Sequence, residues 1–228
     1  PSWRCAADAS PGSPPSSGWL DPGVLVPDRL AARAAALGRV RRAAGRIDAL
    51  YAVAGASGRP LGDGPVHQLS LEAWDGTLAL NATPAFLAAR EALRVMLDQE
   101  PGAAAATRGS LVLMSSVLAS RPAPALFATH AYAAAKAATI GLVRAMAAYY
   151  GEHGIRVNAL APSLVRTPMS ARAAADAASV AFAERRQPLT GGFLDPADVT
   201  EAAVYLCSDE SRAVTGQVLA VDGGWTVT

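Results

Sequence analysis

Cysteine and histidine are scarce in this sequence of 228 residues, which contains two cysteines and three histidines. Cys5 and Cys207 are isolated from each other, so they match no zinc-binding spacing and provide no disulfide framework. We therefore expect no metal site. A reduced, cytoplasmic setting is the simpler interpretation of the two thiols.

Charge imbalance and long apolar runs are absent as well. The 20 basic and 19 acidic residues give a formal net charge of +1, and the densest basic cluster, which includes Arg39, Arg42 and Arg46, has the pattern of a solvated helix face. No run of about 18 apolar residues exists to span a bilayer, and residues 1–10 lack the basic flank and apolar core of a signal peptide. These absences argue against a nucleic-acid or membrane partner.

What the sequence does contain is apolar surface, since 51% of its residues are hydrophobic. This content is enough for one domain with a large core over residues 1–228. Residues 11–27 are rich in proline, glycine and serine, and we expect a loop or an insertion there. Short apolar runs predict strands, and the segments between them predict helices. The expected strands are residues 47–55, 111–114, 155–160 and 217–221, with a further short strand at 3–10, and the expected helices are residues 28–46, 70–97, 130–150 and 196–208.

Strands and helices therefore alternate along the predicted chain. The expected strands are mostly apolar, which is typical of a parallel sheet that is buried on both faces. The alternation predicts a doubly wound α/β fold, Rossmann-like, with a mostly parallel sheet between two layers of helices. In folds of this kind, ligands bind beyond the carboxyl ends of the strands.

Tyr132 and Lys136 are the strongest candidates for chemistry. Residues four apart on a helix lie on the same face, one turn from each other. A lysine ammonium beside a tyrosine hydroxyl favours the phenolate and is expected to lower the tyrosine pKa towards neutral pH. A hydroxyl tuned in this way can exchange a proton with a substrate alcohol or carbonyl. Alone, this spacing also occurs in ordinary helices, where the lysine is merely a surface residue.

The context of this pair carries a resemblance to a known family. Ser115 and Ser116 end the strand that precedes the helix, and two long segments follow it, RVNALAPSLVRTPM at residues 156–169 and the stretch from residue 195 to residue 224 that ends in VDGG. Together with Tyr132-x-x-x-Lys136 these segments resemble the short-chain dehydrogenase/reductase family. The resemblance covers about residues 28–228, and more faintly residues 3–10.

The resemblance implies a role for four catalytic residues. Tyr132 would be the general acid/base, Lys136 would lower its pKa and bind the nicotinamide ribose, and Ser116 would polarise the substrate oxygen. Asn81, in the middle of the long helix, matches the family asparagine that holds a proton-relay water. Its alternative interpretation is an asparagine that the helix merely tolerates.

The resemblance also implies a cofactor, NAD or NADP, and residues that contact it. The loop from Pro162 to Thr167 would close over the nicotinamide, and Asp8 resembles the acidic residue that meets the adenine. The residues expected to bind the cofactor are Asp8, Ala54, Gly55, Tyr132, Lys136, Pro162, Ser163, Val165 and Thr167. The choice between NAD and NADP depends on a strand end that this chain lacks, so it stays open.

One family feature is missing from the chain. The glycine-rich turn that follows the first strand and receives the pyrophosphate should lie well upstream of Asp8, and no segment here replaces it. The chain begins about where the first βαβ unit of the family would end. Either an N-terminal piece exists elsewhere or the phosphate cradle has been discarded. We favour the former, because a sheet without its first two strands would expose an unpaired edge.

Further departures concern the pocket. The family turn Asn-Asn-Ala-Gly reads Ala-Val-Ala-Gly at residues 52–55, so both amides are lost, and Ser163 stands where the family usually has glycine. Sixteen residues separate Ser116 from Tyr132, a little more than usual.

His130 lies two residues before Tyr132 and could reach the pocket, although such a residue more often only occupies the first helical turn. The expected pocket loops are residues 57–69, 121–128 and 168–190.

The sequence therefore predicts an NAD(P)-dependent oxidoreductase that moves a hydride between nicotinamide and a carbonyl or secondary alcohol, in the manner of a 3-oxoacyl reductase or an alcohol dehydrogenase. The substrate would be a small molecule, and the resemblance implies a homo-tetramer or homo-dimer. The alternative is a catalytically inactive family relative that binds a ligand or a partner. Intact Asn81, Ser116, Tyr132 and Lys136 favour the enzyme.

Overall fold

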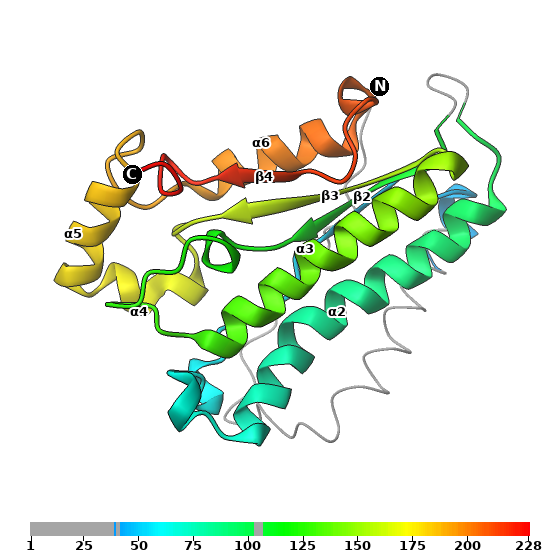
Figure 1. Cartoon of the computed structure of the whole chain (residues 1–228). Coiled ribbons are helices and arrows are strands. Elements are labelled where there is room, and N and C mark those ends of the chain that lie inside the picture. The colour runs from blue at the N-terminus through cyan, green and yellow to red at the C-terminus, as the bar shows by residue number, and fades with distance from the viewer. Residues whose placement is uncertain (1–38, 40–41, 103–106) are drawn as a thin grey trace.

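The computed structural model describes Arg39, residues 42–102 and residues 107–228. The strands in this part of the chain form one sheet, in which neighbouring strands are parallel and follow the order β1-β2-β3-β4 (Figure 1). The strands are β1 (Ala49–Ala52), β2 (Gly109–Met114), β3 (Ile155–Pro162) and β4 (Val218–Val221). Because all of them run the same way, their carboxyl ends meet at one edge of the sheet.

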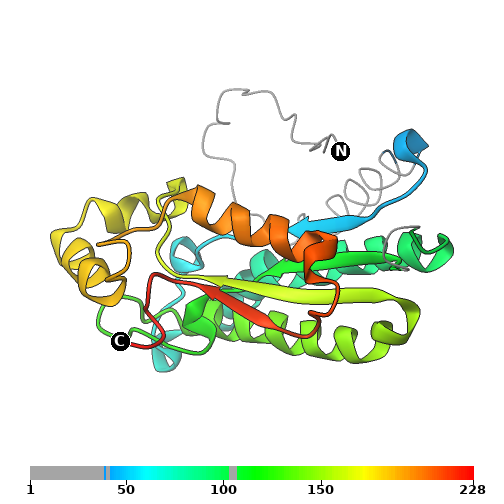
Figure 2. The same ribbon diagram turned by 90° about the horizontal axis from the view of Figure 1, so that it is seen from above.

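Helices cover both faces of this sheet. On one face lie α2 (Leu71–Asp98) and α3 (His130–Tyr150), and on the other lies α6 (Pro196–Cys207) (Figure 2). Two shorter helices, α4 (Ala171–Ala174) and α5 (Ala177–Arg186), gather beyond the carboxyl ends of the strands (Figure 1). Single turns of 3-10 helix occupy Arg59–Leu61, Val66–Gln68, Val117–Ala119, Gly151–His153, Pro168–Ser170 and Asp209–Ser211.

The central strand β2 shows why the sheet needs both helical layers. Successive side chains of a strand point to opposite faces, and Leu111, Val112 and Leu113 are all fully buried. Leu111 and Leu113 pack into the cluster made with α2 and α3, whereas Val112 packs with Leu160 against α6. A strand that is apolar on both faces is stable only when both are covered.

Close approach of α2 to β2 depends on Gly109, the first residue of the strand. A Cβ atom at this position would lie 2.5 Å from Sδ of Met96, a fully buried residue of α2. A larger residue at this position would therefore require the Met96 side chain to move. Glycine here leaves the space that the Met96 side chain fills between α2 and β2.

The helices α2 and α6 each begin at a residue whose side chain caps the first turn. The Ser70 hydroxyl accepts a hydrogen bond from the Ala73 N–H at 3.1 Å and starts α2. At α6 the Asp195 carboxylate accepts from the Ala197 N–H at 2.9 Å, and Pro196 occupies the first helical position. Each side chain satisfies an N–H that has no partner within its own helix. The helix starts predicted at residues 70 and 196 are thus correct to within one residue.

The predicted fold, a doubly wound parallel sheet of Rossmann type, is confirmed. One expectation is wrong: residues 168–190 were predicted as a pocket loop, yet they contain α4 and α5. Asp176 explains the second of these, because its carboxylate accepts from the Ser179 N–H and caps an alanine-rich segment. The strand expected at 3–10 and the loop expected at 11–27 lie outside the described residues. In the part of the chain that is described, no helix is both long and apolar enough to cross a membrane.

Candidate active site

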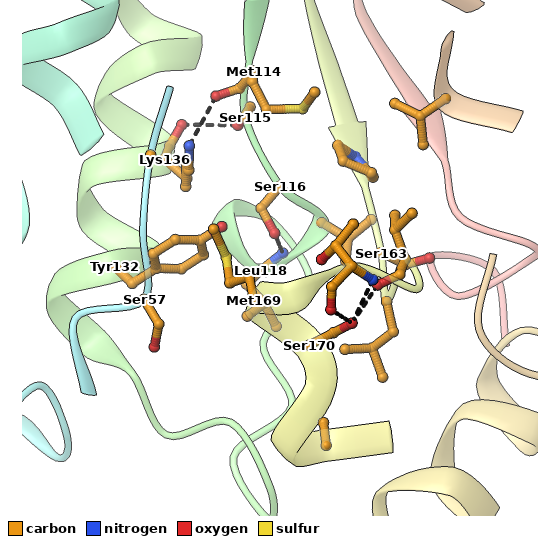
Figure 3. A pocket seen from close by; sticks show the side chains of 18 of the residues that line it. Ser57, Met114, Ser115, Ser116, Leu118, Tyr132, Lys136, Ser163, Met169 and Ser170 are labelled. Carbon is orange, nitrogen blue, oxygen red and sulfur yellow. Dashed lines mark hydrogen bonds between the residues drawn. The ribbon is translucent and has the colours of Figure 1, made fainter. Parts of the chain in front are cut away.

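A cavity of about 510 Å3 opens beyond the carboxyl ends of β1, β2 and β3. Its walls include Ser116 after β2, Tyr132 and Lys136 on α3, and residues 162–165 at the end of β3 (Figure 3). The parallel sheet brings these segments together because each strand delivers the residues that follow it to the same edge. Ser116, Tyr132 and Lys136, predicted as one constellation, are indeed neighbours.

Tyr132 projects from the first turn of α3 towards Ser116 (Figure 3). Burial raises the pKa of the Tyr132 hydroxyl above its ordinary value, and a hydrogen bond with the Ser116 side chain acts in the opposite direction. Ser116 is itself buried, and its Oγ accepts from the Leu118 N–H at 3.3 Å. At neutral pH Tyr132 therefore carries its proton and is prepared to donate it.

Lys136 lies one turn further along α3 and is almost completely buried. Its Nζ donates to the Met114 carbonyl at 3.1 Å and lies 5.5 Å from the centre of the Tyr132 ring. Burial lowers the pKa of Lys136 from 10.5 to about 8. The Ser115 hydroxyl donates to the Lys136 carbonyl at 2.9 Å, which ties the end of β2 to this turn of the helix.

The expected lowering of the Tyr132 pKa by Lys136 is wrong for this structure. The ammonium contacts the Met114 carbonyl instead of the tyrosine hydroxyl, and burial is the largest influence on the phenol. Removal of water disfavours the charged form of both groups, which raises a phenol pKa and lowers an ammonium pKa. The helical spacing places the two side chains on one face but does not determine which atoms meet.

Asn81 joins the middle of α2 to the segment that follows β1. Its Nδ2 donates to the carbonyls of Ala56 and Thr77, each at 2.9 Å, and its Oδ1 accepts from the Ala56 N–H at 3.2 Å. Gly55 packs beside it: a Cβ there would lie 2.8 Å from Asn81 Oδ1 and 3.1 Å from Lys136 Nζ. Asn81 and Gly55 therefore hold the wall behind Lys136.

The loop after β3 is held from behind by Gln187, which is fully buried. The Gln187 amide donates to the Leu164 carbonyl and accepts from the Leu164 N–H, both at 3.1 Å. Further along, the Thr167 N–H donates to the Ser170 hydroxyl at 3.0 Å. Ser163, in contrast, has a buried hydroxyl oxygen without a hydrogen-bond partner, so it is a polar atom with capacity for a ligand.

Comparison with known proteins identifies the family. A family model described as "Enoyl-(Acyl carrier protein) reductase" matches residues 28–226. The chain belongs to the short-chain dehydrogenase/reductase family. It is 37% identical over 187 residues to Short-chain dehydrogenase reductase 3a of Arabidopsis thaliana, which covers 80% of this chain and 67% of that protein.

Two further relatives bear on the site. The chain is 38% identical over 200 residues to a protein of Xanthobacter autotrophicus named Inactive 2-(S)-hydroxypropyl-CoM dehydrogenase 2, covering 86% of this chain and 80% of that protein. A gluconate 5-dehydrogenase of Burkholderia cenocepacia, solved in complex with NADP and tartrate, superposes with a TM-score of 0.75 at 28% identity and covers 87% of this chain and 72% of that one. The chain thus spans about two thirds to four fifths of the length of these relatives.

Most of the predicted cofactor residues of this short-chain dehydrogenase/reductase line the cavity. Those that do are Gly55, Tyr132, Lys136, Pro162, Ser163, Val165 and Thr167. Ala54 is exposed and lies outside the lining, and Asn81 stands behind it. Asp8 lies outside the described residues. The contacts of all of them with a cofactor stay predictions.

The side chains present suit the nicotinamide half of a cofactor. Lys136 has three N–H donors and donates one to Met114, while the Ser163 hydroxyl is buried and unpartnered. Ribose hydroxyls and a carboxamide are groups that such donors and acceptors can hold. Lys136 and Ser163 are therefore the residues of this chain best placed for the family's cofactor.

The sequence did not indicate two residues that shape the site. The Asp63 carboxylate accepts from the N–H groups of Ala131 and Tyr132, at 2.9 and 3.0 Å, and so anchors the start of α3. Trp225, fully buried, lines the cavity and donates from Nε1 to the Arg121 carbonyl at 3.3 Å. Both contacts join segments more than 60 residues apart, and only the glycines on either side of Asp63 signalled a special turn.

His130, the histidine nearest to Tyr132, has a structural role. Its Nδ1 accepts a hydrogen bond from the Val66 N–H at 3.0 Å, and the backbone N–H of His130 donates to the Gly64 carbonyl at 3.3 Å. Both bonds hold the segment before α2 against the start of α3. Of the two interpretations of His130, the structural one is thus supported.

Proposed function

We propose that this protein is an NAD(P)-dependent oxidoreductase that interconverts a secondary alcohol and a carbonyl compound, with Tyr132 as its general acid/base. The observation that carries the proposal is the grouping of the Tyr132 hydroxyl, Ser116 and Lys136 in one cavity at the carboxyl ends of the strands. The bound NADP of the gluconate 5-dehydrogenase neighbour supports a nicotinamide cofactor. The choice between NAD and NADP is left to measurement.

The proposed reduction uses the protonated form of Tyr132. The Ser116 hydroxyl donates to the carbonyl oxygen of the substrate and orients it, and the Tyr132 hydroxyl transfers its proton to that oxygen as the carbonyl becomes an alcohol. Lys136 and Ser163 would hold a nicotinamide cofactor, which would supply the hydride that the carbonyl carbon receives. The Nζ of Lys136 lies 5.5 Å from the centre of the Tyr132 ring, so Lys136 would keep the cofactor ribose beside the tyrosine.

A nicotinamide absorbance assay with a panel of ketones and alcohols, run with both NADH and NADPH, tests the proposal. Tyr132→Phe should lower kcat by at least about a hundredfold, since general acid catalysis contributes on that order. Tyr149→Phe is the matched control: Tyr149 lies on the same helix but is 64% exposed, and its loss should leave kcat unchanged. Undiminished turnover in Tyr132→Phe would refute the mechanism.

The second candidate is a catalytically inactive relative that binds a ligand or a partner. Two observations favour it: the turn at the end of β1 has Ala52 and Val53 in place of the two family amides, and a relative at 38% identity is named inactive. Calorimetry with NADH and NADPH separates the candidates when it accompanies the turnover assay. Cofactor binding without turnover of any substrate in the panel would favour the inactive relative, and turnover would exclude it.

We also propose that the protein forms a homo-tetramer or homo-dimer. The outer faces of α2 and α3 expose large apolar side chains, Phe86 at 45%, Leu97 at 42% and Tyr149 at 64%. Large apolar side chains that stay exposed on helices are candidates for burial in a protein interface. Sedimentation velocity measures the oligomeric state directly. A monomer at micromolar concentration would contradict the proposal.

A further inference from the structure

The cavity wall has an unusual charge distribution. Three cationic side chains, those of Arg59, Lys136 and Arg172, contribute to it, and no aspartate or glutamate of the described chain does so. Lys136 belongs to the proposed catalytic group, but the two arginines have no part in the proposed proton transfer. A wall that is otherwise mostly apolar, with cations and no acid, favours an anionic ligand.

Arg59 comes from the segment between β1 and α2. Its Nη2 donates to the Leu126 carbonyl at 2.6 Å, which holds the side chain against the segment before α3 and leaves the other guanidinium nitrogens available. Asp63 is the nearby acid that acts on its charge, but both Asp63 oxygens already accept from the N–H groups of Ala131 and Tyr132. Arg59 forms no salt bridge with any described residue.

Arg172 comes from α4, which is far from Arg59 in the sequence. Asp176 is near enough to interact with its charge, yet the Asp176 carboxylate accepts from both the N–H and the hydroxyl of Ser179, at 2.9 and 2.6 Å, where it caps α5. Within the described residues Arg172 has no salt bridge either. Both acids near the arginines are thus engaged in holding helices.

The positive charges of the two guanidinium groups repel each other. Burial, together with the positive charge of Arg172, lowers the pKa of Arg59 below its ordinary value, and Asp63 only partly opposes this. Such repulsion is relieved when an anion lies between two cations. Arginine is also the side chain best suited to anions, because its planar fork donates two parallel hydrogen bonds to a carboxylate or a phosphate.

We propose that Arg59 and Arg172 bind an anionic group of the substrate, a carboxylate or a phosphate, while its reacting carbon lies at Tyr132. The cavity wall also includes the apolar side chains of Leu118, Phe127 and Met169, so it suits a hydrocarbon body. The substrate class is therefore a hydroxy or keto compound with an acidic group at some distance from the reacting carbon. This inference rests on the proposed function, whose site it extends.

Isothermal titration calorimetry with cyclohexanecarboxylate, phenyl phosphate and the neutral cyclohexanecarboxamide tests the inference without requiring turnover. At low salt either anion should bind at least about tenfold more tightly than the amide, because a charge-assisted hydrogen bond is roughly twice as strong as a neutral one. The carboxylate and phosphate arms decide between the two acidic groups. An amide that binds as tightly as both anions would overturn the proposal.

Variants show whether these two arginines are responsible. Arg59→Gln and Arg172→Gln should each weaken binding of the preferred anion about five- to tenfold and leave the amide unaffected. Arg144→Gln, at an exposed position on α3 outside the cavity lining, is the matched control. It should leave the affinities for the anion and for the amide unchanged. Unchanged anion affinity in both cavity variants would also overturn the proposal.

The same variants separate substrate from cofactor. NADH and NADPH also carry phosphates, so their affinities are measured by calorimetry for the wild type and for both cavity variants. We expect the two cofactor affinities to change less than twofold. A loss of cofactor affinity as large as the loss of anion affinity would assign the arginines to the cofactor and refute the substrate site. Failure of the proposed function shows differently, as an absence of turnover with anion binding intact.

Discussion

Lys136 keeps its ammonium group in a place from which most water is excluded. The single hydrogen bond to the Met114 carbonyl offsets only part of the lost hydration, so the pKa falls from 10.5 to about 8. A buried cation is therefore a cost in folding free energy. A residue retained at such a cost is better explained by a role in the site than by a role in the core.

Lys136→Met should consequently stabilise the protein while it abolishes turnover. The pKa difference of 10.5 − 8 = 2.5 units corresponds to about 3 kcal/mol in the free energy of unfolding, and loss of the hydrogen bond reduces the expected gain to about 2 kcal/mol. Because the folded pKa is depressed, the gain is complete below pH 8 and disappears as pH rises from about 8 to 10.5. Urea denaturation of the wild type and of Lys136→Met at pH 7 and pH 10 measures this gain. An equal gain at both pH values would contradict a depressed pKa for Lys136.

The pH dependence of turnover follows from the pKa of Tyr132. Burial raises this pKa and the hydrogen bond with Ser116 lowers it, so alcohol oxidation, which needs the deprotonated hydroxyl, should accelerate as pH rises. In Ser116→Ala the lowering influence is lost, and the ascending limb of the kcat profile should move to higher pH. We also expect kcat to fall on the order of a hundredfold, as when other oxygen-stabilising donors are removed. If the ascending limb of the kcat profile stays at the same pH in Ser116→Ala, the hydrogen bond between Ser116 and Tyr132 is ruled out.

At the scale of elements, α3 depends on a residue far from it in the sequence. Asp63 accepts from the first N–H groups of the helix, and its negative charge also interacts favourably with the positive end of the helix dipole. A neighbouring hydrogen bond, from the Val66 N–H to His130, joins the same two segments. The turn that presents Tyr132 is thus held by the segment before α2.

Asp63→Asn should reduce the free energy of unfolding by about 1–2 kcal/mol, because the amide nitrogen cannot accept from a helix N–H. If α3 then frays, kcat should fall while the affinity for cofactor is less affected, since Lys136 lies a turn further in. Asp75→Asn, which alters an exposed aspartate of α2, serves as the control and should leave both quantities unchanged. Thermal or urea denaturation and steady-state kinetics measure the two effects, and equal stability of the two variants would exclude the capping role.

At the scale of the whole molecule, the cavity is assembled from segments that span most of the described chain, from Tyr51 to Trp225. A ligand that contacts several of them at once binds the folded protein and not the unfolded chain. Folding and ligand binding are therefore coupled. The organisation of the complete sequence as one domain stays a prediction.

Thermal denaturation with added NADH or NADPH tests this coupling. A cofactor at about 100 times its Kd should increase the free energy of unfolding by about 2.7 kcal/mol. Tyr132→Phe keeps Lys136 and should show a similar increase, whereas Lys136→Met should show a smaller one. The absence of any shift in the wild type with either cofactor would contradict a nicotinamide site in this chain.

Elements that depend on local order were predictable. The apolar runs located β2, β3 and β4 to within about two residues of each end, and the capping residues Ser70 and Asp195 marked helix starts. α4 and α5 were missed because they have only 4 and 10 residues, which is too short for a periodic apolar pattern to stand out. Asp63, Arg59 and Arg172 were missed for another reason, since each acts on segments far away in the sequence.

The sequence by itself determined that Tyr132 and Lys136 share a helix face and that Ser116 ends the preceding strand, because helical periodicity and strand order are local properties. Only the tertiary structure decided what surrounds these atoms. Packing at the carboxyl edge of the sheet removed water from Tyr132 and Lys136, directed the ammonium to the Met114 carbonyl, and thereby set both pKa values. The physical reason is that a pKa depends on solvation and on nearby charge, and both are fixed when distant segments pack together.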